Sequence, residues 1–566
     1  MADYQPITAD RAFILENVLG APGQWQQLAP FADVDAALAR QVLEESGRFV
    51  GAVIAPLNRV GDTTGAQFKD GAVTMPPGFA YAYRQFWQAG WPALAADPAH
   101  GGQGLPAVLE AQLYEMLSGA NHGFTMAPGL LHGAYDCLRH HGSEALKTQY
   151  LEKIATGEWL ATMCLTEPQA GSDLGLVSTR ALAQADGTHL ISGSKIFISS
   201  GENDLTENIV HLVLAREPDA PAGPKGLSLF LVPKFYPDGT RSAVTCESIE
   251  EKMGLHASPT CAMRFDAARG WIVGAPGRGL AAMFVMMNAA RLHVALQGLG
   301  LLDAAWQKAD AYARERRQMR APGASAASLL IEHPAMRRIL DTQRAWIDAG
   351  RVLAYQTALE LDIARHHPDA TRRAQAERWC ALTTPVMKAA FTHQAFHGGS
   401  DCLQVFGGHG YVRESGIEQQ VRDARVTMIY EGTNEIQAID LLVRKVLADG
   451  GESWCALLQE LAQPLGASAL AALTRTHLQA LQALTLKLVA ACRADAALAY
   501  EVADDYLRAA AVALLCWAGT RIEAAANAQA QPERWRAPLQ ALQRWIAPEL
   551  PMRCAIIGDR LPASAP

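Results

Sequence analysis

The sequence lacks the features of a secreted, membrane-spanning or nucleic-acid-binding protein. Its first residues, MADYQPITAD, carry acidic and polar side chains where a signal peptide has basic residues and then an apolar core. The longest uninterrupted apolar run, Ala509 to Gly519, is shorter than the ~18 residues that a membrane helix needs. Acidic residues outnumber basic ones, 57 to 49, so the basic face of a general nucleic-acid binder is not expected. These absences predict a cytoplasmic protein without stable membrane insertion.

Paired cysteines are also lacking, although the chain contains ten cysteines. They are scattered singly and form no C-x-x-C motif, which predicts reduced core residues rather than a disulfide framework or a thiolate zinc site. The two adjacent histidine pairs, His140-His141 and His366-His367, would not face each other on a helix. We therefore expect no functional metal.

The hydrophobic pattern divides the chain into four regions. Half of the 566 residues are hydrophobic, which is enough for several buried cores. The pattern is helical in residues 1–160, changes to short β-branched runs in 161–275, and returns to long helical periods in 276–446 and 455–566. Strands and helices do not alternate, so a doubly wound fold is not expected. We predict an α+β multidomain protein with domains at these four ranges.

The stretch MIYEGTNEIQ contains a glutamate, Glu431, between an apolar-aromatic run and the Gly432-Thr433 pair. The ordinary interpretation of such a glutamate is a solvated charge beside a helix N-terminus, where the helix dipole favours carboxylates. Only the wider context of the chain favours a catalytic role.

That context is a set of ordered segments: CLTEPQAGSD (164–173), GSKIFISSG (193–201), KMGLHASPTC (252–261), RERRQ (314–318), QVFGGHGYVRE (404–414) and YEGTNEIQ (430–437). Together they resemble the signatures of the acyl-CoA dehydrogenase family, over roughly residues 35 to 445. The additional C-terminal region and the HASPTC segment resemble the longer subfamily that includes the 3-methylthiopropanoyl-CoA dehydrogenases.

The resemblance implies a fold and an activity. The expected fold is acyl-CoA dehydrogenase-like: an N-terminal α-helical domain, a central β-barrel or sandwich, a C-terminal four-helix bundle and an extra helical domain. The expected reaction is FAD-dependent α,β-dehydrogenation of an acyl-CoA to a trans-2-enoyl-CoA, with an electron-transfer flavoprotein as acceptor. Glu431 stands where the family has its catalytic base. Some members carry the base directly before an arginine matching Arg291, but here that residue is Ala290.

The resemblance also implies binding residues. The expected FAD contacts are Met163, Leu165, Thr166, Gly171, Ser172, Phe197, Ser199, Arg316, Gln318, Gln404, Gly407, Gly408, Thr433 and Glu435. The expected substrate contacts are Ser172, Asn288, Arg291 and Gly432. Arg316 and Gln318 would reach the FAD of a partner subunit in a homodimer, although a basic run of this kind is also an ordinary solvated helix face.

Two other functions stay open. An acyl-CoA oxidase would pass the electrons to oxygen, and sequence motifs do not reveal oxygen reactivity. A second alternative is an FAD-containing stress protein that binds DNA through a basic C-terminal domain. Residues 451–566 contain ten Lys/Arg and ten Asp/Glu, which cancel to zero and disfavour DNA binding. A helical tail of this length must bury its apolar stripe, and we expect it to fold back on its own subunit.

Overall fold

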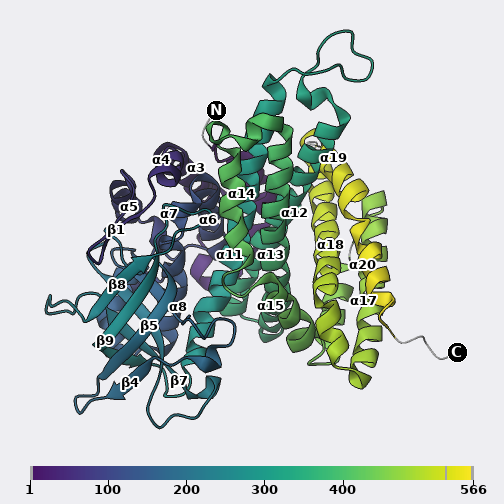
Figure 1. Cartoon of the computed structure of the whole chain (residues 1–566). Coiled ribbons are helices and arrows are strands. Elements are labelled where there is room, and N and C mark those ends of the chain that lie inside the picture. The colour runs from purple at the N-terminus through teal and green to yellow at the C-terminus, as the bar shows by residue number, and fades with distance from the viewer. Residues whose placement is uncertain (1–3, 464, 530–531, 562–566) are drawn as a thin grey trace. The chain divides into compact units, whose positions relative to one another are not determined.

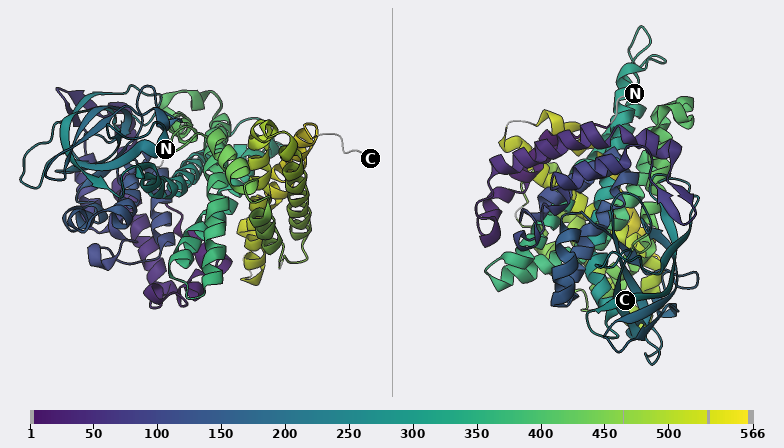
Figure 2. Two further views of the ribbon diagram at one scale, coloured as in Figure 1. Left: turned by 90° about the horizontal axis from the view of Figure 1, so that it is seen from below. Right: turned by 90° about the vertical axis from the view of Figure 1, so that its left-hand side faces the viewer.

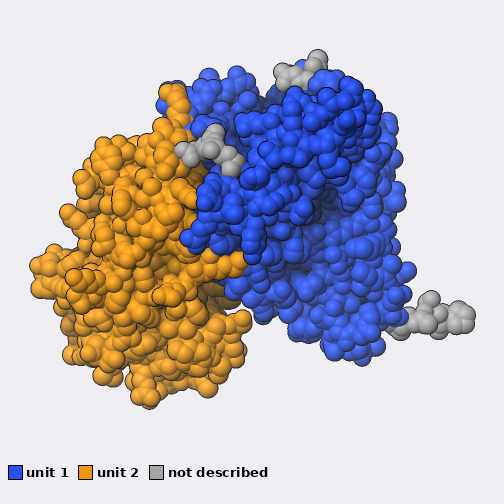
Figure 3. Space-filling view, turned by 45° about the horizontal axis from the view of Figure 1, so that its top comes forward, with its two compact units in different colours: residues 1–47, 106–119, 294–566 blue, residues 48–105, 120–293 orange. Residues whose placement is uncertain are grey.

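A computed structural model describes residues 4–463, 465–529 and 532–561, without the side chains of residues 288 and 289. The chain forms two compact units, shown in separate colours in Figure 3. Unit 1 contains residues 1–47, 106–119 and 294–566, and unit 2 contains residues 48–105 and 120–293. Both units are therefore built from segments that are distant in the sequence.

Unit 2 contains the central β region. Its seven-stranded sheet consists of β3 (Leu160–Cys164), β4 (Arg180–Ala183), β5 (His189–Ser199), β6 (Ile209–Arg216), β7 (Leu227–Pro233), β8 (Val244–Ile249) and β9 (Thr260–Val273). Strands β4, β5, β9 and β7 pair in that order, and both β4 and β7 also pair with β6, which closes a ring (Figure 1). Strand β7 is buried throughout, and β6 is buried except for its last residue, which explains their largely apolar sequences. The expected central β-barrel is confirmed.

Short helices and a small hairpin complete unit 2. They are α4 (Leu57–Thr64), β1 (Gln67–Lys69), β2 (Ala72–Thr74), α5 (Phe79–Gln88), α7 (His122–Thr125), α8 (Leu131–His141), α9 (Glu144–Leu146) and α10 (Glu152–Ala155). Phe79 and Phe86 of α5 pack against Phe124 of α7, with ring centroids 6.0 Å apart in both pairs. This aromatic cluster fixes α5 against α7.

Unit 1 is a helical bundle. Its main helices are α1 (Thr8–Phe13), α2 (Ala21–Trp25), α6 (Ala107–Ala120), α12 (Pro334–His366), α13 (Ala370–Val405), α14 (Ile417–Arg425) and α15 (Asn434–Ile439). Three helices are divided between the units: α3 (Ala36–Phe49) begins in unit 1, α6 ends at Ala120 in unit 2, and α11 (Gly279–Glu315) belongs to unit 1 from Val294 onward. Inside the bundle, the Arg351 guanidinium binds Glu115 and Asp303, each at 2.7 Å, and all three side chains are fully buried. These charges tie α6, α11 and α12 together.

The C-terminal tail is part of unit 1. Its helices are α16 (Glu452–Leu461), α17 (Ala469–Ala494), α18 (Ala497–Ala528), α19 (Glu533–Ala541) and α20 (Glu549–Gly558). Helix α18 packs on α12, α13 and α15, and the yellow tail lies beside these green helices in Figures 1 and 2. Arg534 of α19 binds Asp10 at 2.8 Å and Asp348 at 2.9 Å. The extra helical region therefore packs on its own chain.

Two helices, α11 and α18, are long and apolar enough to cross a membrane by length and composition alone. The most apolar window is 62% buried in α11 and 83% buried in α18, which is typical of core helices. The apolar run Ala509 to Gly519 lies inside α18. This helix has 32 residues and is therefore longer than the apolar run.

The ten cysteines are free thiols, and seven of them are buried. Among the described residues, no group of three or more histidine, cysteine or acidic side chains is arranged to hold a metal ion.

Candidate active site

Glu431 and Gly432 form a left-handed turn directly before α15. Their φ angles are 54° and 85°. A Cβ atom at residue 432 would lie 2.7 Å from Nε2 of Gln437, so this position requires glycine. Thr433 is the N-cap of α15, and its hydroxyl accepts a hydrogen bond from the Ile436 amide at 3.3 Å. The helix start expected from the sequence is confirmed, and the glutamate before it is half-buried in a strained conformation.

Buried side chains hold both carbonyl groups of this turn. The Gln437 amide donates to the Glu431 carbonyl at 3.1 Å. The Lys388 ammonium, from α13, donates to the Gly432 carbonyl at 2.7 Å and to Oδ1 of Asn434 at 3.1 Å. Lys388 and Gln437 are both fully buried. The backbone around Glu431 is therefore fixed by contacts from the protein interior.

Two neighbouring side chains complete the environment of this turn. The Tyr430 hydroxyl donates to Oε1 of Gln297 at 2.6 Å. Burial, and then the nearby Glu431 charge, raise the pKa of Tyr430 well above its ordinary value, so the phenol stays neutral. Glu435 lies exposed in the first turn of α15, where hydrogen bonds from its own amide and from Thr433 lower its pKa. This favours a negative charge at the helix N-terminus.

The expected flavin-contacting turn lies in unit 2, at the end of β3. Met163 on β3 and Leu165 directly after it are half-buried, while Cys164 between them is fully buried. Thr166 is half-buried, and Gly171 and Ser172 are exposed. A Cβ atom at residue 171 would meet open space, so the backbone is accessible to a ligand there.

Glu167 holds this turn in shape. Its carboxylate lies 2.8 Å from the Lys195 ammonium and accepts hydrogen bonds from Ser178 and Thr179, with the Thr179 hydroxyl at 2.6 Å. Lys195 also donates to the Leu165 carbonyl at 3.0 Å. Burial alone would raise the pKa of Glu167, but the Lys195 charge and these hydrogen bonds outweigh it and lower the pKa to about 2. The hydroxyls of Thr166 and Ser172 are thus carried by a rigid segment.

Phe197 lies beside this turn on β5. The pairing of β5 with β9 is irregular between Lys195 and Ile198, and Phe197 has a φ of 58°. Its ring is 58% exposed, whereas the adjacent Ile198 is buried and Ser199 is half-buried. An exposed flat ring near hydroxyl groups and accessible backbone amides fits the face and the polar edge of an isoalloxazine.

The remaining expected cofactor contacts lie on two exposed loops of unit 1. Arg316 and Gln318 follow the end of α11, in the loop that extends from the bundle before α12 (Figure 1). Arg316 therefore lies just beyond the helix, rather than on it. Gln404, Gly407 and Gly408 are exposed at the end of α13.

An aromatic contact brings these two loops together. The rings of Tyr312 on α11 and Phe406 are stacked, with their centroids 4.3 Å apart. The Arg316 amide donates to the Tyr312 carbonyl at 2.9 Å, which fixes the start of the first loop beside this pair. Lys388 and Gln404 are sixteen residues apart on α13, about 24 Å along its axis. The paired loops and the Glu431 turn are therefore two separate surfaces of unit 1.

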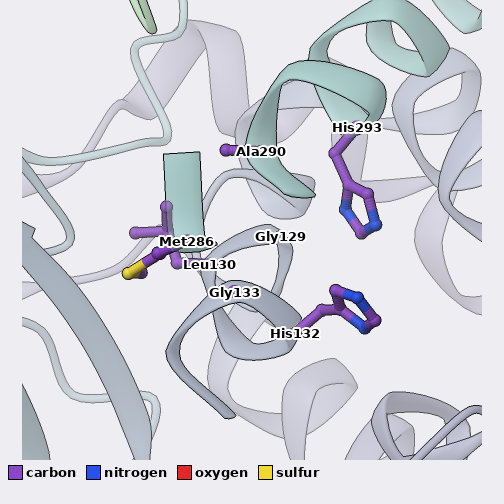
Figure 4. Close-up of a pocket in the computed structure, with 7 residues that line it drawn as sticks. All are labelled: Gly129, Leu130, His132, Gly133, Met286, Ala290 and His293. Atoms are coloured by element: carbon purple, nitrogen blue, oxygen red, sulfur yellow. The ribbon is translucent and has the colours of Figure 1, made fainter. Parts of the chain in front are cut away.

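The expected substrate residues Arg291 and Asn288 belong to the part of α11 in unit 2. Arg291 is buried, and the side chain of Asn288 lies outside the described residues. The preceding residue, Ala290, lines a small pocket with no room for a water molecule. Its lining, drawn in Figure 4, is Gly129, Leu130, His132, Gly133, Met286, Ala290 and His293.

The polar part of this pocket is a histidine pair. The imidazole rings of His132 on α8 and His293 on α11 are stacked, with their centroids 5.5 Å apart. His132 also lies near Asp136, with 3.6 Å between Nε2 and Oδ2. The pocket is thus apolar on one side, at Leu130 and Met286, and polar on the other.

Three supporting residues were not predicted from the sequence: Lys195, Glu167 and Lys388. The sequence contains a signal for Glu167 and Lys195, because Glu167 lies in the motif CLTEPQAGSD and Lys195 lies in the motif GSKIFISSG. Lys388 stands in an ordinary helical pattern, and nothing in the local sequence distinguishes it from a surface lysine.

Comparison with known proteins agrees with this arrangement. Residues 39–158, 162–268 and 277–446 match the N-terminal, middle and C-terminal domains of acyl-CoA dehydrogenases. The chain is 46% identical to the 3-methylmercaptopropionyl-CoA dehydrogenase of Ruegeria pomeroyi, over 80% of this chain and 77% of that protein. It is 36% identical to the broad-specificity linear acyl-CoA dehydrogenase FadE5 of Mycobacterium tuberculosis, over 80% of this chain and 76% of that protein.

The fold of the whole chain, including the tail, is also found in a solved structure. A Bacillus anthracis acyl-CoA dehydrogenase complexed with FAD covers 95% of this chain and 91% of its own, with a TM-score of 0.76 and 20% identity. The three domain matches together cover more than half of the 566 residues. The chain belongs to the acyl-CoA dehydrogenase family, whose members are FAD-dependent oxidoreductases.

Proposed function

We propose that the protein removes two hydrogens from adjacent carbons of a short acyl-CoA thioester, with Glu431 as the base that takes the α proton. The observation that carries this proposal is the left-handed, half-buried glutamate on a turn whose carbonyls are held from the interior. Non-glycine residues in this conformation are uncommon and cluster at functional sites.

The residues around the turn have separate tasks. Glu431 accepts the proton, and its fixed backbone limits the directions in which the carboxylate can point. Gly432 allows close approach of a substrate to the backbone, and Thr433 opens a helix whose N-terminus favours negative groups. In unit 2, Thr166, Ser172 and Phe197 would hold FAD, which when bound supplies the acceptor for the hydride that leaves the β carbon. Arg316, Gln318, Gln404, Gly407 and Gly408 are exposed and available to the FAD of a second copy in a homodimer.

The names of the relatives support a short acyl chain. The relative with 46% identity is named for a short thioether acyl group, 3-methylmercaptopropionyl. Two further relatives, at 36% and 34% identity over 71% and 72% of this chain, are butyryl-CoA dehydrogenases of Syntrophomonas wolfei. Short linear and thioether acyl-CoAs are therefore the proposed substrates.

We further propose an electron-transfer flavoprotein as the electron acceptor and a cytoplasmic location. The support for the acceptor is that both curated relatives are named dehydrogenases rather than oxidases. The DNA-binding alternative gains no support from the tail, because several of its arginines are engaged by carboxylates. Arg508 binds Glu549 and Arg553 binds Asp505, each at 2.7 Å.

An anaerobic titration tests the proposed function. The purified, FAD-containing protein is mixed in separate experiments with butanoyl-, 3-methylthiopropanoyl-, octanoyl- and palmitoyl-CoA. The absorbance of the flavin band at about 450 nm is followed in each. We expect the two short thioesters to bleach the flavin fastest. Bleaching by none of them would contradict the proposal, and stoichiometric hydrogen peroxide in air would instead identify an oxidase.

A further inference from the structure

Lys388 is an unusual lysine, because its side chain is fully buried in the middle of α13. A buried ammonium without compensating acceptors is costly, and lysine is rarely found fully buried unless it is paired. The Gly432 carbonyl at 2.7 Å and Oδ1 of Asn434 at 3.1 Å are acceptors for this ammonium. Both belong to the segment that carries Glu431.

The second acceptor is itself held in place. Asn434 donates from Nδ2 to the Ala389 carbonyl at 3.1 Å, and its Oδ1 also accepts from the Thr392 hydroxyl at 3.1 Å. These contacts fix the orientation of the amide group, so that its oxygen faces the Lys388 ammonium. Three residues of α13 therefore contact Asn434 at the start of α15: Lys388, Ala389 and Thr392.

These contacts determine the backbone of the turn. Each peptide group is planar and rigid, so fixing a carbonyl fixes the plane to which it belongs. Lys388 fixes the plane that follows Gly432, and Gln437 fixes the plane that follows Glu431. These two planes set φ and ψ of Gly432, and the first of them along the chain also contains the Cα atom of Glu431, so it limits the position from which the Glu431 side chain extends.

We propose that Lys388 is a positioning residue for the catalytic base: its ammonium holds the Gly432 carbonyl and thereby keeps the Glu431 carboxylate aimed at the substrate. This inference rests on the proposed function, in which Glu431 is the base. Lys388 does not need to touch substrate or cofactor for this role.

The test compares Lys388→Met with the matched control Lys445→Met. Lys445 also donates to a backbone carbonyl of α13, that of Ala381, and pairs with Asp440 at 3.6 Å. Flavin reduction is measured by anaerobic stopped flow on FAD-loaded protein, and acyl-CoA binding is measured separately by the spectral shift with an enoyl-CoA product. We expect Lys388→Met to slow flavin reduction by about 10²-fold with enoyl-CoA affinity unchanged, because small displacements of a reacting group have effects of this size. Lys445→Met should leave the rate unchanged.

Chemical rescue separates positioning from a general loss of structure. In Lys388→Ala, added propylammonium should refill the cavity and restore part of the rate, whereas propan-1-ol, which has similar length but no charge, should not. A crystal structure of Lys388→Met should show the Glu431–Gly432 turn displaced. An unchanged reduction rate in Lys388→Met, or equal rescue by the alcohol, would overturn the inference.

Two further variants keep the outcomes distinct. If Glu431→Gln reduces flavin normally, the proposed function itself is wrong. If Glu431→Gln is inactive and Lys388→Met is fully active, only the role of Lys388 is wrong. If Lys388→Met yields no folded protein, Gln437→Met is the substitute, because it removes the donor to the Glu431 carbonyl. We expect Gln437→Met to slow flavin reduction without changing enoyl-CoA affinity. A normal rate of flavin reduction in Gln437→Met would contradict the positioning of Glu431 by these buried donors.

Discussion

The Lys195 ammonium lies 2.8 Å from Oε1 of Glu167, and both side chains are almost completely buried. The pair joins β5 to the turn after β3, which are the two elements of unit 2 that carry the expected FAD contacts. Breaking one partner of a buried ion pair leaves an uncompensated charge in the interior.

The first prediction therefore concerns this ion pair. Lys195→Met should lower the free energy of unfolding by about 3 kcal/mol, the usual cost of leaving a buried charge unpaired, and should weaken FAD retention. The measurements are thermal unfolding and the FAD content after gel filtration. Glu247→Gln, at an exposed position on β8, is the control and should change neither.

The same pair predicts a pH dependence. The pKa of Glu167 is lowered to about 2 in the folded protein, so its stabilising contribution is complete at neutral pH. That contribution is lost as the pH falls from the ordinary glutamate range, near 4.5, toward 2. The difference in Tm between the wild-type protein and Glu167→Gln should consequently be largest above pH 5 or so and should narrow at lower pH. A constant difference across this range would show that the Glu167 carboxylate is not the titrating group.

For the catalytic base, Glu431→Gln keeps the size of the side chain but removes the proton acceptor. We expect folded, yellow protein that binds acyl-CoA and reduces flavin at least ~10²-fold more slowly, which is the usual contribution of a general base. Glu452→Gln, at an exposed position in the first turn of α16, should behave as wild type. A near-normal rate of flavin reduction in Glu431→Gln would show that Glu431 is not the catalytic base.

Sharing of FAD between subunits is tested at Arg316. If the exposed Arg316 reaches the cofactor of a partner subunit, Arg316→Ala should lower FAD affinity in a protein that remains a dimer. Arg320→Ala, in the same exposed loop, serves as the control. Equal FAD affinity in the two variants would leave Arg316 as a solvated surface residue.

The tail gives a prediction about assembly. We expect a homodimer of about twice the 60.8 kDa chain mass by light scattering, because the tail covers α12 and α13. Truncation after residue 450 would uncover Trp379, whose ring packs on Trp517 with 5.4 Å between centroids, and should cause aggregation or tetramers. A tetrameric intact protein, or a well-behaved truncated dimer, would contradict this role of the tail.

A point mutation tests the packing of the tail without removing the tail. Arg534→Met should remove one partner of Asp348, which keeps Arg344 at 3.1 Å, and should lower the free energy of unfolding by about 1.5 kcal/mol, the usual contribution of a hydrogen bond to a charged group. Arg536→Met, two residues away in an exposed pair with Glu533, should be neutral.

The family, the fold class and the helix start at Thr433 could be predicted because they depend on local patterns and short motifs. The supporting contacts could not, because they join residues that are distant in the sequence. Lys195 is 28 residues from Glu167, and Lys388 is 44 residues from Gly432. Only the folded chain reveals that these lysines face inward. The left-handed conformation of Glu431 was also not predictable, since sequence rules assign such φ angles to glycine and not to glutamate.

The strained turn has a consequence for protein engineering. A left-handed residue with a Cβ atom costs roughly 1 kcal/mol relative to an unstrained one, and glycine avoids most of that cost. Glu431→Gly should therefore be at least as thermostable as the wild type while lacking the base. A selection for heat resistance alone would accept that inactive variant, so any campaign to stabilise this enzyme needs a screen for turnover at every round.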